Sequence, residues 1–228
     1  CSDAQVAAGK LAWWRAELDA LYAGRPQHPV TKALQAVLPQ FAVPQEQLLE
    51  IIDGMEMDLQ QTRYLDFKAL SLYCYRVASV VGLLAAEIFG HTDRRTLKYA
   101  HDLGMAFQLT NIIRDVGEDA RRGRVYLPLD ELKRFEVPVA DILNARHSEN
   151  FRRLMEFQIE RAEGYYAQAM SQLPEADRKA QRPGLVMAAI YRTLLDEIKR
   201  DGCQVLNQRT SLTPLRKLWI AWRTWIRG

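Results

Sequence analysis

Four polar side chains recur within an otherwise apolar stretch near the middle of the chain. They are Gln108, Asn111, Asp115 and Asp119, at intervals of three, four and four residues. A helix advances about 100° per residue, so these positions fall on one narrow stripe of a single helix. Carboxylates that face an apolar interior are costly unless they are paired or bound to a metal. We therefore expect the stripe to line an internal cavity that supplies such partners.

Two kinds of partner would satisfy these carboxylates: arginine side chains, or a hard cation with oxygen ligands. Magnesium is usually held by one or two carboxylates together with phosphates and waters, and Asn111, Asp115 and Asp119 offer oxygens on successive turns. Guanidinium groups can bind phosphate oxygens, and several crowd the same end of the helix. These are Arg114, Arg121, Arg122 and Arg124. The pattern favours a magnesium-diphosphate site over the alternative, a solvated helix face with ordinary ion pairs.

The composition indicates one globular domain over residues 1–228, since 48% of the residues are hydrophobic and can form a sizeable core. The 31 basic and 28 acidic residues give a net charge of +3, which is too small and too evenly mixed to favour a nucleic-acid partner. Cys1, Cys74 and Cys203 lack metal-ligand spacing, so we expect free thiols. Because no signal-peptide pattern or long apolar run is present, we predict a cytoplasmic protein without a bilayer-spanning helix.

The elements that must position the stripe are helices. Apolar residues recur at helical spacing nearly everywhere, and no β-branched run between turn residues predicts a strand, so the predicted fold class is all-α. A first helix follows Ser2 and Asp3, which can cap it, and stops at Gly24. Two long apolar helices, at residues 65–89 and 94–118, are central. Further helices are predicted after Pro29 and over residues 46–59, 126–135, 148–173, 184–199 and 215–226.

Two segments carry a family resemblance. LGMAFQLTNIIRDVGEDARRGRVYLP, residues 103–128, resembles the second aspartate-rich signature of the squalene and phytoene synthase family in the order of its Gly, Gln, Asn, Asp, Arg, aromatic and Pro positions. YCYRVASVVG, residues 73–82, resembles the other family signature, with Ser79 as an accepted small residue. Shorter segments as far as residue 222 are similar to bacterial members that make squalene precursors for hopanoids. The resemblance implies an isoprenoid-synthase-type helical bundle around a central cavity.

The resemblance assigns metal and catalytic roles. By it, Asn111 and Asp115 bind Mg²⁺, and Asp119 lies in the same site. The candidate catalytic residues are Arg114, Asp115 and Asp119 together with Tyr73, which would lie near the reacting carbons. A buried tyrosine that is hydrogen-bonded in the core is the alternative interpretation of Tyr73.

The resemblance also implies a substrate-binding group. Gln108, Arg114 and Tyr191 would contact the diphosphate of the substrate or its vicinity. Arg124 and Tyr126 would belong to a flap over the diphosphates. Core packing is the alternative for Tyr191, and a plain loop between helices is the alternative for the two flap residues.

One departure from the family pattern concerns the start of the chain. Family members carry a first aspartate-rich motif upstream of the helix that begins here, and nothing in this sequence corresponds to it. Asp53 and Asp58 lie in DGMEMD, whose spacing and position match a different family segment. We expect an N-terminally truncated form of a longer enzyme, one that binds its substrate weakly and fails to ionise it.

The implied reaction is the Mg²⁺-dependent, head-to-head condensation of two farnesyl diphosphates to presqualene diphosphate or squalene. Apolar residues of the two central helices would shield the carbocation from water. Gly82 and Gly104 leave room either for close helix approach or for a prenyl chain. Two alternatives stay open: phytoene synthesis from two geranylgeranyl diphosphates, and a non-catalytic relative that serves protein assembly.

The final segment, LRKLWIAWRTWIRG, predicts an amphipathic helix. Its leucines and tryptophans share one face, while Arg216, Lys217 and Arg223 lie elsewhere. A basic, aromatic helix can lie on an anionic membrane, which would hold the protein peripherally on the inner membrane face. Packing of the tryptophans against the domain is the alternative.

Overall fold

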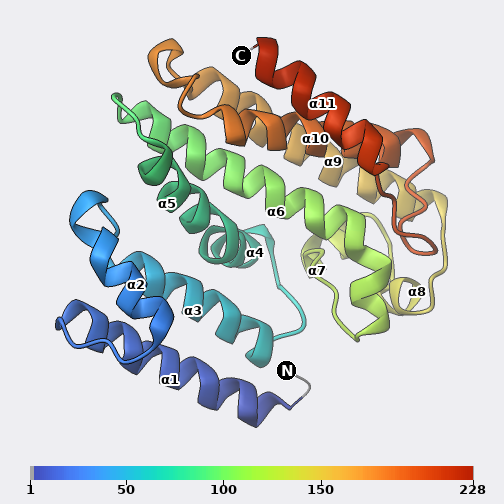
Figure 1. Cartoon of the computed structure of the whole chain (residues 1–228). Helices are drawn as coiled ribbons and strands as arrows, with labels where there is room; N and C mark the ends of the chain where they lie inside the picture. Colours follow the sequence, from blue (N-terminus) through green and yellow to red (C-terminus); the bar gives the residue numbers. More distant parts are fainter. Residues whose placement is uncertain (1–2, 228) are drawn as a thin grey trace.

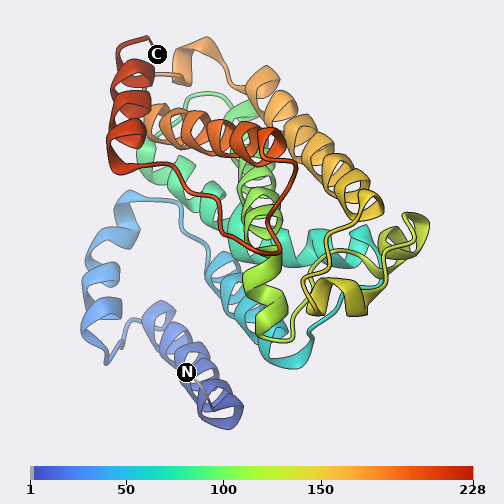
Figure 2. The same ribbon diagram turned by 90° about the vertical axis from the view of Figure 1, so that its right-hand side faces the viewer.

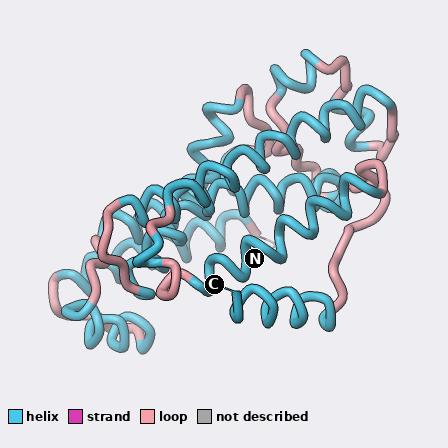
Figure 3. The backbone as a smooth tube through the Cα atoms, turned by 90° about the horizontal axis from the view of Figure 1, so that it is seen from above, coloured by secondary structure: helices cyan, strands magenta, loops and turns pink. Residues whose placement is uncertain are grey.

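The computed structural model describes residues 3–227 (Figure 1). Figure 3 shows helices joined by loops, and the described residues form no strand beyond an isolated bridge between Arg63 and Val125. The all-α prediction is therefore confirmed. The α-helices are α1 (Ala4–Tyr22), α2 (Pro29–Val37), α3 (Gln45–Gln60), α4 (Phe67–Cys74), α5 (Val80–Phe89), α6 (Arg95–Arg121), α7 (Leu129–Arg134), α8 (Val139–Leu143), α9 (Glu149–Gln172), α10 (Arg182–Arg200) and α11 (Pro214–Arg227).

Helices α1, α2 and α3 form one side of the molecule (Figure 1). The Asp3 carboxylate accepts two hydrogen bonds from backbone N–H groups in the first turn of α1 and so caps that helix. Ser2, the other predicted cap, lies outside the described residues. Gly24 follows α1 with a φ of 75°, in the left-handed region that glycine adopts without strain. A small separate core joins α1 to α3, and its buried members are Leu18, Leu21 and Ile52.

Helix α6 is the centre of the larger core, as predicted for residues 94–118. It packs along α9 on one side and against α5 and α10 on others, so buried residues occur around most of its circumference. Figure 2 shows α6 enclosed in this way. The side chains of α9 in this core are wholly buried, among them Phe151, Leu154, Met155 and Ile159. A helix with so many packed neighbours holds its remaining polar stripe in a fixed position.

The predicted helix at residues 65–89 is divided. Helix α4 passes into a π-helical turn at Tyr75–Ser79 before α5 begins. The Arg76 side chain in this turn pairs with Glu50 and Asp53 of α3, at 2.8 and 3.5 Å. Gly54 of α3 lies directly against the same turn, since a Cβ there would stand 2.9 Å from the Arg76 Cβ. The π-turn is thus the point at which α3 packs onto the central helices.

Two glycines allow α6 to cross α5 and the π-turn at close range. A Cβ on Gly104 would lie 2.6 Å from the Ser79 Cα, and a Cβ on Gly82 would lie 2.7 Å from the Ala100 carbonyl oxygen. The Ser79 hydroxyl donates a hydrogen bond to the His101 carbonyl oxygen at 2.9 Å across this crossing. Of the two roles considered for these glycines, the structure shows close helix approach.

Several helix ends differ from prediction. Helix α10 begins at Arg182 rather than residue 184, because Pro183 fits the first turn, where a backbone N–H has no partner within the helix. Helix α6 continues to Arg121, beyond the predicted end at residue 118, and α8 was not predicted. The free-thiol prediction is confirmed for the buried Cys74 and Cys203, while Cys1 lies outside the described residues.

One stretch of the described chain, Phe67–Phe89, is long and apolar enough to cross a membrane by length and composition, although no such stretch was identified from the sequence. A core helix of a soluble bundle passes the same test. Here the stretch is interrupted by the π-turn and carries Arg76, which is ion-paired with α3. One such helix is weak evidence for a membrane span.

Candidate functional site

The polar stripe of α6 is half-buried along its length. Gln108, Asn111, Asp115 and Asp119 all have intermediate exposure, and the Asn111 amide donates to the Gln108 side-chain oxygen at 3.4 Å. The sequence predicted that the stripe lines an internal cavity. Of the four residues, Asp119 borders an enclosed space, and that space measures only about 10 Å³. The stripe is thus accessible from outside along part of its length.

Asp115 is held by two arginines. Arg114 donates from Nε to Asp115 Oδ1 at 2.8 Å and from Nη2 to Oδ2, and Arg209 donates from Nε to Oδ1 at 2.7 Å. Burial disfavours the carboxylate, but these two guanidinium groups outweigh burial and hold the pKa of Asp115 below its usual range. Arg209 also lies 3.4 Å from Glu118. Arginine pairing, one of the two chemistries expected of the stripe, is therefore present at Asp115.

Asp119 has the opposite environment. Among the described residues, no ion pair or hydrogen bond is made by its carboxylate, while its backbone carbonyl accepts from the N–H groups of Arg122 and Arg124, both at 2.9 Å. Burial, and next the nearby charge of Asp115, raises the pKa of Asp119 to about 6. A half-buried carboxylate beside another carboxylate carries an uncompensated negative charge. A bound cation would offset the cost of that charge.

Asp58 of α3 is the centre of a second cluster. Its carboxylate accepts a hydrogen bond from the Tyr126 hydroxyl at 2.7 Å and another from the Tyr73 hydroxyl at 3.1 Å. The Arg124 guanidinium donates to the Asp58 backbone carbonyl at 2.8 Å. Burial, followed by the Asp58 carboxylate, raises the pKa of Tyr126 to about 12, so this phenol stays protonated as a donor. The cluster joins α3, α4 and the loop at residues 122–128.

Tyr64 completes the second cluster. Its ring stacks on Tyr126 with centroids 5.8 Å apart and is tilted against Tyr73 at 5.5 Å. It is 1% exposed, and its hydroxyl has no hydrogen-bond partner among residues 3–227. Burial, with the neighbouring charge of Asp58 next, raises the pKa of Tyr64 well above its ordinary value. A buried hydroxyl without a partner is uncommon in folded proteins.

The loop at residues 122–128 links the two clusters. Arg124 contacts Asp119 through its backbone N–H and Asp58 through its side chain. Asp119, Arg124 and Tyr126 also border the same small space. The loop is fixed from outside by Arg63, whose guanidinium donates to the Gly123 carbonyl oxygen at 2.6 Å. The two predicted flap residues therefore border the same small space as Asp119 and are tied to Asp58 of α3.

Tyr191 of α10 approaches the stripe from another side. It is half-buried, its ring centroid lies 5.0 Å from that of Phe107, and its hydroxyl helps to raise the pKa of Arg114, after the larger contribution of Asp115. The nine residues predicted for the site thus belong to one region, in which Tyr73 and Tyr191 enter from different helices. Their roles in binding and catalysis stay predictions.

Sequence reasoning missed three members of this region. Asp58 was noticed in DGMEMD, but its pattern gave no reason to connect it with Tyr73. Tyr64 and Arg209 stand in segments without helical periodicity, so no motif indicated them. Arg209 reaches Asp115 because residues 205 and 206 pack on Gly117, where a Cβ would lie 2.3 Å from the Leu206 carbonyl oxygen. This contact depends on the tertiary fold, which spacing along the chain does not reveal.

The donors suit a hard cation only in part. The described residues contain no preformed group of three acidic, histidine or cysteine side chains around a common point. Asn111, Asp115 and Asp119 nevertheless offer oxygen donors, which Mg²⁺ prefers, and Asp119 lacks a compensating charge pair. We conclude that the residues fit a cation held jointly with an anionic ligand, one that would have to compete with Arg209 for Asp115.

Comparison with known proteins identifies the family. The chain matches the squalene/phytoene synthase family model over residues 1–216. A phytoene synthase of Arthrospira platensis is 39% identical over 221 residues, which cover 91% of this chain and 72% of the relative. Further relatives at 36–38% identity are also phytoene synthases. The chain spans from 50% to 74% of the length of these and similar curated relatives.

Solved structures agree with this assignment. A dehydrosqualene synthase in complex with a ligand superposes with a TM-score of 0.83 at 27% identity, covering 94% of this chain and 76% of the other. A squalene synthase of Alicyclobacillus acidocaldarius superposes with a TM-score of 0.77 at 25% identity, covering 84% and 73%. The helical bundle is the isoprenoid synthase fold of these neighbours. The chain therefore belongs to the squalene/phytoene synthase family, whose members are prenyltransferases.

Proposed function

We propose that this protein condenses two geranylgeranyl diphosphates head to head in the manner of a phytoene synthase. The observation that carries the choice is that the curated relatives named above, at 36–39% identity, are phytoene synthases. The expectation of farnesyl diphosphate, squalene and a hopanoid role is not confirmed by these phytoene synthases, although two structural neighbours are dehydrosqualene and squalene synthases. The alternative considered from sequence, phytoene synthesis, is the better supported of the two.

The α6 stripe and its arginines would bind the diphosphate groups. Arg114 is half-buried next to Asp115, and Arg124 borders the same small space as Asp119. Guanidinium groups bind phosphate oxygens in a bidentate manner, and fixed donors stabilise negative charge on a departing diphosphate. The family uses a divalent metal for diphosphate ionisation, and here Asn111, Asp115 and Asp119 would hold Mg²⁺, which would supply further stabilisation of that charge.

Tyr73 and Asp58 would act next to the reacting carbons. The Tyr73 hydroxyl donates to Asp58, and burial holds the pKa of Tyr73 far above its ordinary value, so the phenol stays neutral. A neutral ring can border a carbocation without supplying a nucleophilic phenolate. The stacked rings of Tyr64, Tyr73 and Tyr126 would also exclude water from this end of the site.

Substrate length can be tested by binding and turnover together. Purified protein with Mg²⁺ would be given the thiolo analogues of farnesyl and geranylgeranyl diphosphate in a calorimeter, and the labelled diphosphates in a product assay. We expect tighter binding of the longer analogue, because each additional buried methylene contributes about 0.8 kcal/mol, and any hydrocarbon product to derive from geranylgeranyl diphosphate. Preference for the shorter substrate in both assays would restore the squalene interpretation.

A further inference from the structure

Helix α11 turns its apolar face away from the protein. Large apolar side chains on one face of the helix are between 52% and 80% exposed: Leu215, Leu218, Trp219, Trp222, Trp225 and Ile226. Ile220, on the opposite side, is buried against the domain. The tryptophans thus contact the domain only along their edges, with Trp219 beside α10 and Trp225 beside Arg182, and more than half of each side chain is exposed. An exposed apolar surface of this kind usually marks an interaction site.

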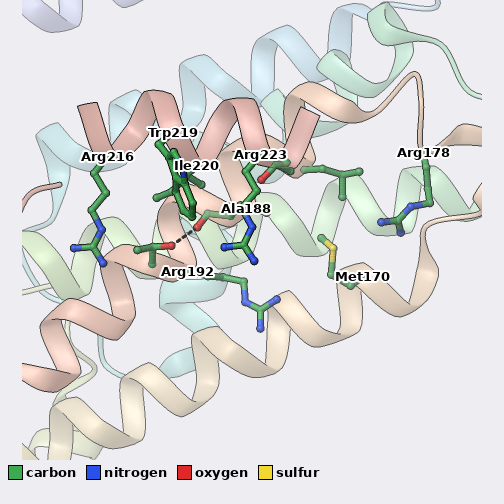
Figure 4. A pocket seen from close by; sticks show the side chains of 12 residues that line it. Met170, Arg178, Ala188, Arg192, Arg216, Trp219, Ile220 and Arg223 are labelled. Carbon is green, nitrogen blue, oxygen red and sulfur yellow. Dashed lines mark hydrogen bonds between the residues drawn. The ribbon is translucent and has the colours of Figure 1, made fainter. Parts of the chain in front are cut away.

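A cavity lined with arginines adjoins this face. It lies between α9, α10 and α11, encloses about 430 Å³, and has an apolar floor that includes Leu185, Ala188 and Ile220. Figure 4 shows Arg216 and Arg223 reaching towards it from α11, with Arg192 and Arg178 around the same opening. Trp219 stands at its edge, where the Arg223 guanidinium lies 5.1 Å from the Trp219 ring centroid.

The charges of this cavity are only partly balanced. Arg216 pairs with Glu197 at 2.7 Å, and Arg178 lies 3.7 Å from Glu175. Within the described part of the chain, neither Arg192 nor Arg223 forms an ion pair with a carboxylate. Helix α11 contains no acidic residue at all. On the other flank of the apolar face, the Arg182 guanidinium lies 5.6 Å from the Trp225 ring centroid.

We propose that α11 docks this protein on an anionic lipid bilayer, with a lipid phosphate held in the arginine-lined cavity. The exposed leucines and tryptophans would enter the interface between headgroups and acyl chains, where aromatic side chains are favoured. The arginines at the edge of that face would meet phosphate oxygens, which guanidinium groups bind well. Charge favours this occupant over a second copy of the chain, because two basic α11 helices would repel each other.

Vesicle flotation tests the docking surface. The protein would be mixed with vesicles of phosphatidylcholine alone, or of equal parts phosphatidylcholine and phosphatidylglycerol. We expect binding to the anionic vesicles that weakens as salt is raised, and little binding to the neutral vesicles. The double variants Leu218→Ser with Trp222→Ser, and Arg192→Gln with Arg223→Gln, should each reduce anionic-vesicle binding about tenfold or more. The changed side chains are surface groups, so circular dichroism melts should stay close to wild type.

Matched controls come from distant surfaces. Val30 is 59% exposed on α2 and Arg146 has a 71% exposed side chain, and Val30→Ser and Arg146→Gln should bind as wild type does. Equal binding to both vesicle types, or unchanged binding by either double variant, would overturn the proposal.

Two further outcomes identify a different occupant. Light scattering of the wild-type protein tests self-association. If the wild type is a dimer and the double variant Leu218→Ser with Trp222→Ser is a monomer, membrane docking is overturned in favour of self-association. Stabilisation of the vesicle-free protein by inorganic phosphate at constant ionic strength, lost in Arg192→Gln with Arg223→Gln, would indicate a soluble phosphate ligand instead. Prenyl turnover does not enter either readout, so failure here leaves the proposed function standing.

Discussion

Asp115 and Asp119 lie one helical turn apart, yet the pKa values of their carboxyl groups are shifted in opposite directions. Two arginines lower the pKa of Asp115, whereas burial and the charge of Asp115 raise the pKa of Asp119 to about 6. The raised value means that the ionised Asp119 destabilises the folded protein above that pH. Perturbed pKa values of this kind are common at binding sites where a ligand supplies the compensating charge.

Replacing Asp119 with asparagine should stabilise the protein in the absence of metal. Because the folded pKa lies above the unfolded value, the cost of the charge is fully present above pH 6 and disappears as the pH falls through 6 towards 4. The gain at neutral pH should be at most about 3 kcal/mol, reduced by solvent screening. Urea unfolding of Asp119→Asn at pH values well above and well below 6 measures it.

The control for this experiment is Asp196→Asn, at an exposed position on α10, which should change stability little at either pH. Loss of stability in Asp119→Asn at the higher pH would show that the carboxylate has a favourable partner, contrary to its environment in this structure.

Asp177 shows the reverse linkage. It is 2% exposed, and its carboxylate accepts hydrogen bonds from the hydroxyls of Thr92 and Thr96 at 2.7 and 2.6 Å and from two backbone N–H groups. Burial opposes the charge, but these donors outweigh burial and lower the pKa of Asp177. The stabilisation is fully present above the unfolded pKa near 4 and is lost as the pH falls below it.

Asp177→Asn should therefore lower the free energy of unfolding at neutral pH by about 2–3 kcal/mol, since an amide cannot accept four hydrogen bonds through two equivalent oxygens. The deficit should narrow in acid. Equal deficits at neutral and acid pH would mean that the charge of Asp177 is not what the donors stabilise.

The residues of the site differ in how far they could be predicted. The α6 stripe follows from a period of three and four residues, which one helix turns into one face, so its membership needed no tertiary information. Arg209 and Asp58 come from other elements. Their positions depend on the packing of residues 205–206 on Gly117 and on the hydrogen bonds of Tyr73 and Tyr126. Neither contact produces a local pattern in the sequence, so neither Arg209 nor Asp58 could be assigned to the site from the sequence.

The crossing of α6 with the π-turn positions Tyr73 relative to the stripe. Gly104→Ala should destabilise the protein by about 1–3 kcal/mol, because the new Cβ would meet backbone atoms of Ala78 and Ser79 at 2.6–2.8 Å and backbone atoms cannot move aside. Thermal unfolding of purified variants provides the measurement.

Gly164→Ala on α9 is the matched control. No atom lies within 4 Å of a Cβ at that position, so the variant should gain about 0.5–1 kcal/mol from helix propensity. If Gly104→Ala behaved like Gly164→Ala, the close helix crossing would be incorrect.

The sequence predicted where the main helices lie, but it did not predict the π-turn that interrupts the helix at residues 65–89. Periodicity and capping residues located the main helices to within a few residues, as with α6 and α9. No proline or glycine stands in the run Tyr75–Ser79 to mark an interruption. The π-turn arises where Arg76 pairs with Glu50 and where Gly54 admits α3. Packing between helices determines an interruption of that kind, so the helix propensity of the local sequence does not predict it.

The side of the molecule formed by α1–α3 and the core around α6 meet at the candidate site. Arg15 of α1 pairs with Asp53 and Glu56 at 2.5 and 2.7 Å, and α3 in turn contributes Asp58 to Tyr73. Composition predicted a sizeable core and apolar spacing predicted helices, but the division into a small and a large core required knowing which helices pack together. The site thus depends on contact between regions that are distant in sequence.

In the proposed function, the α6 stripe and its arginines bind a diphosphate together with a divalent cation. Isothermal titration of the protein with inorganic diphosphate, with and without Mg²⁺, measures this binding. We predict binding that requires Mg²⁺ and that is weakened at least tenfold, about 1.4 kcal/mol, by Asp115→Asn or Asp119→Asn, with Asp196→Asn unchanged. Binding that is independent of Mg²⁺, or equal in all these variants, would contradict it.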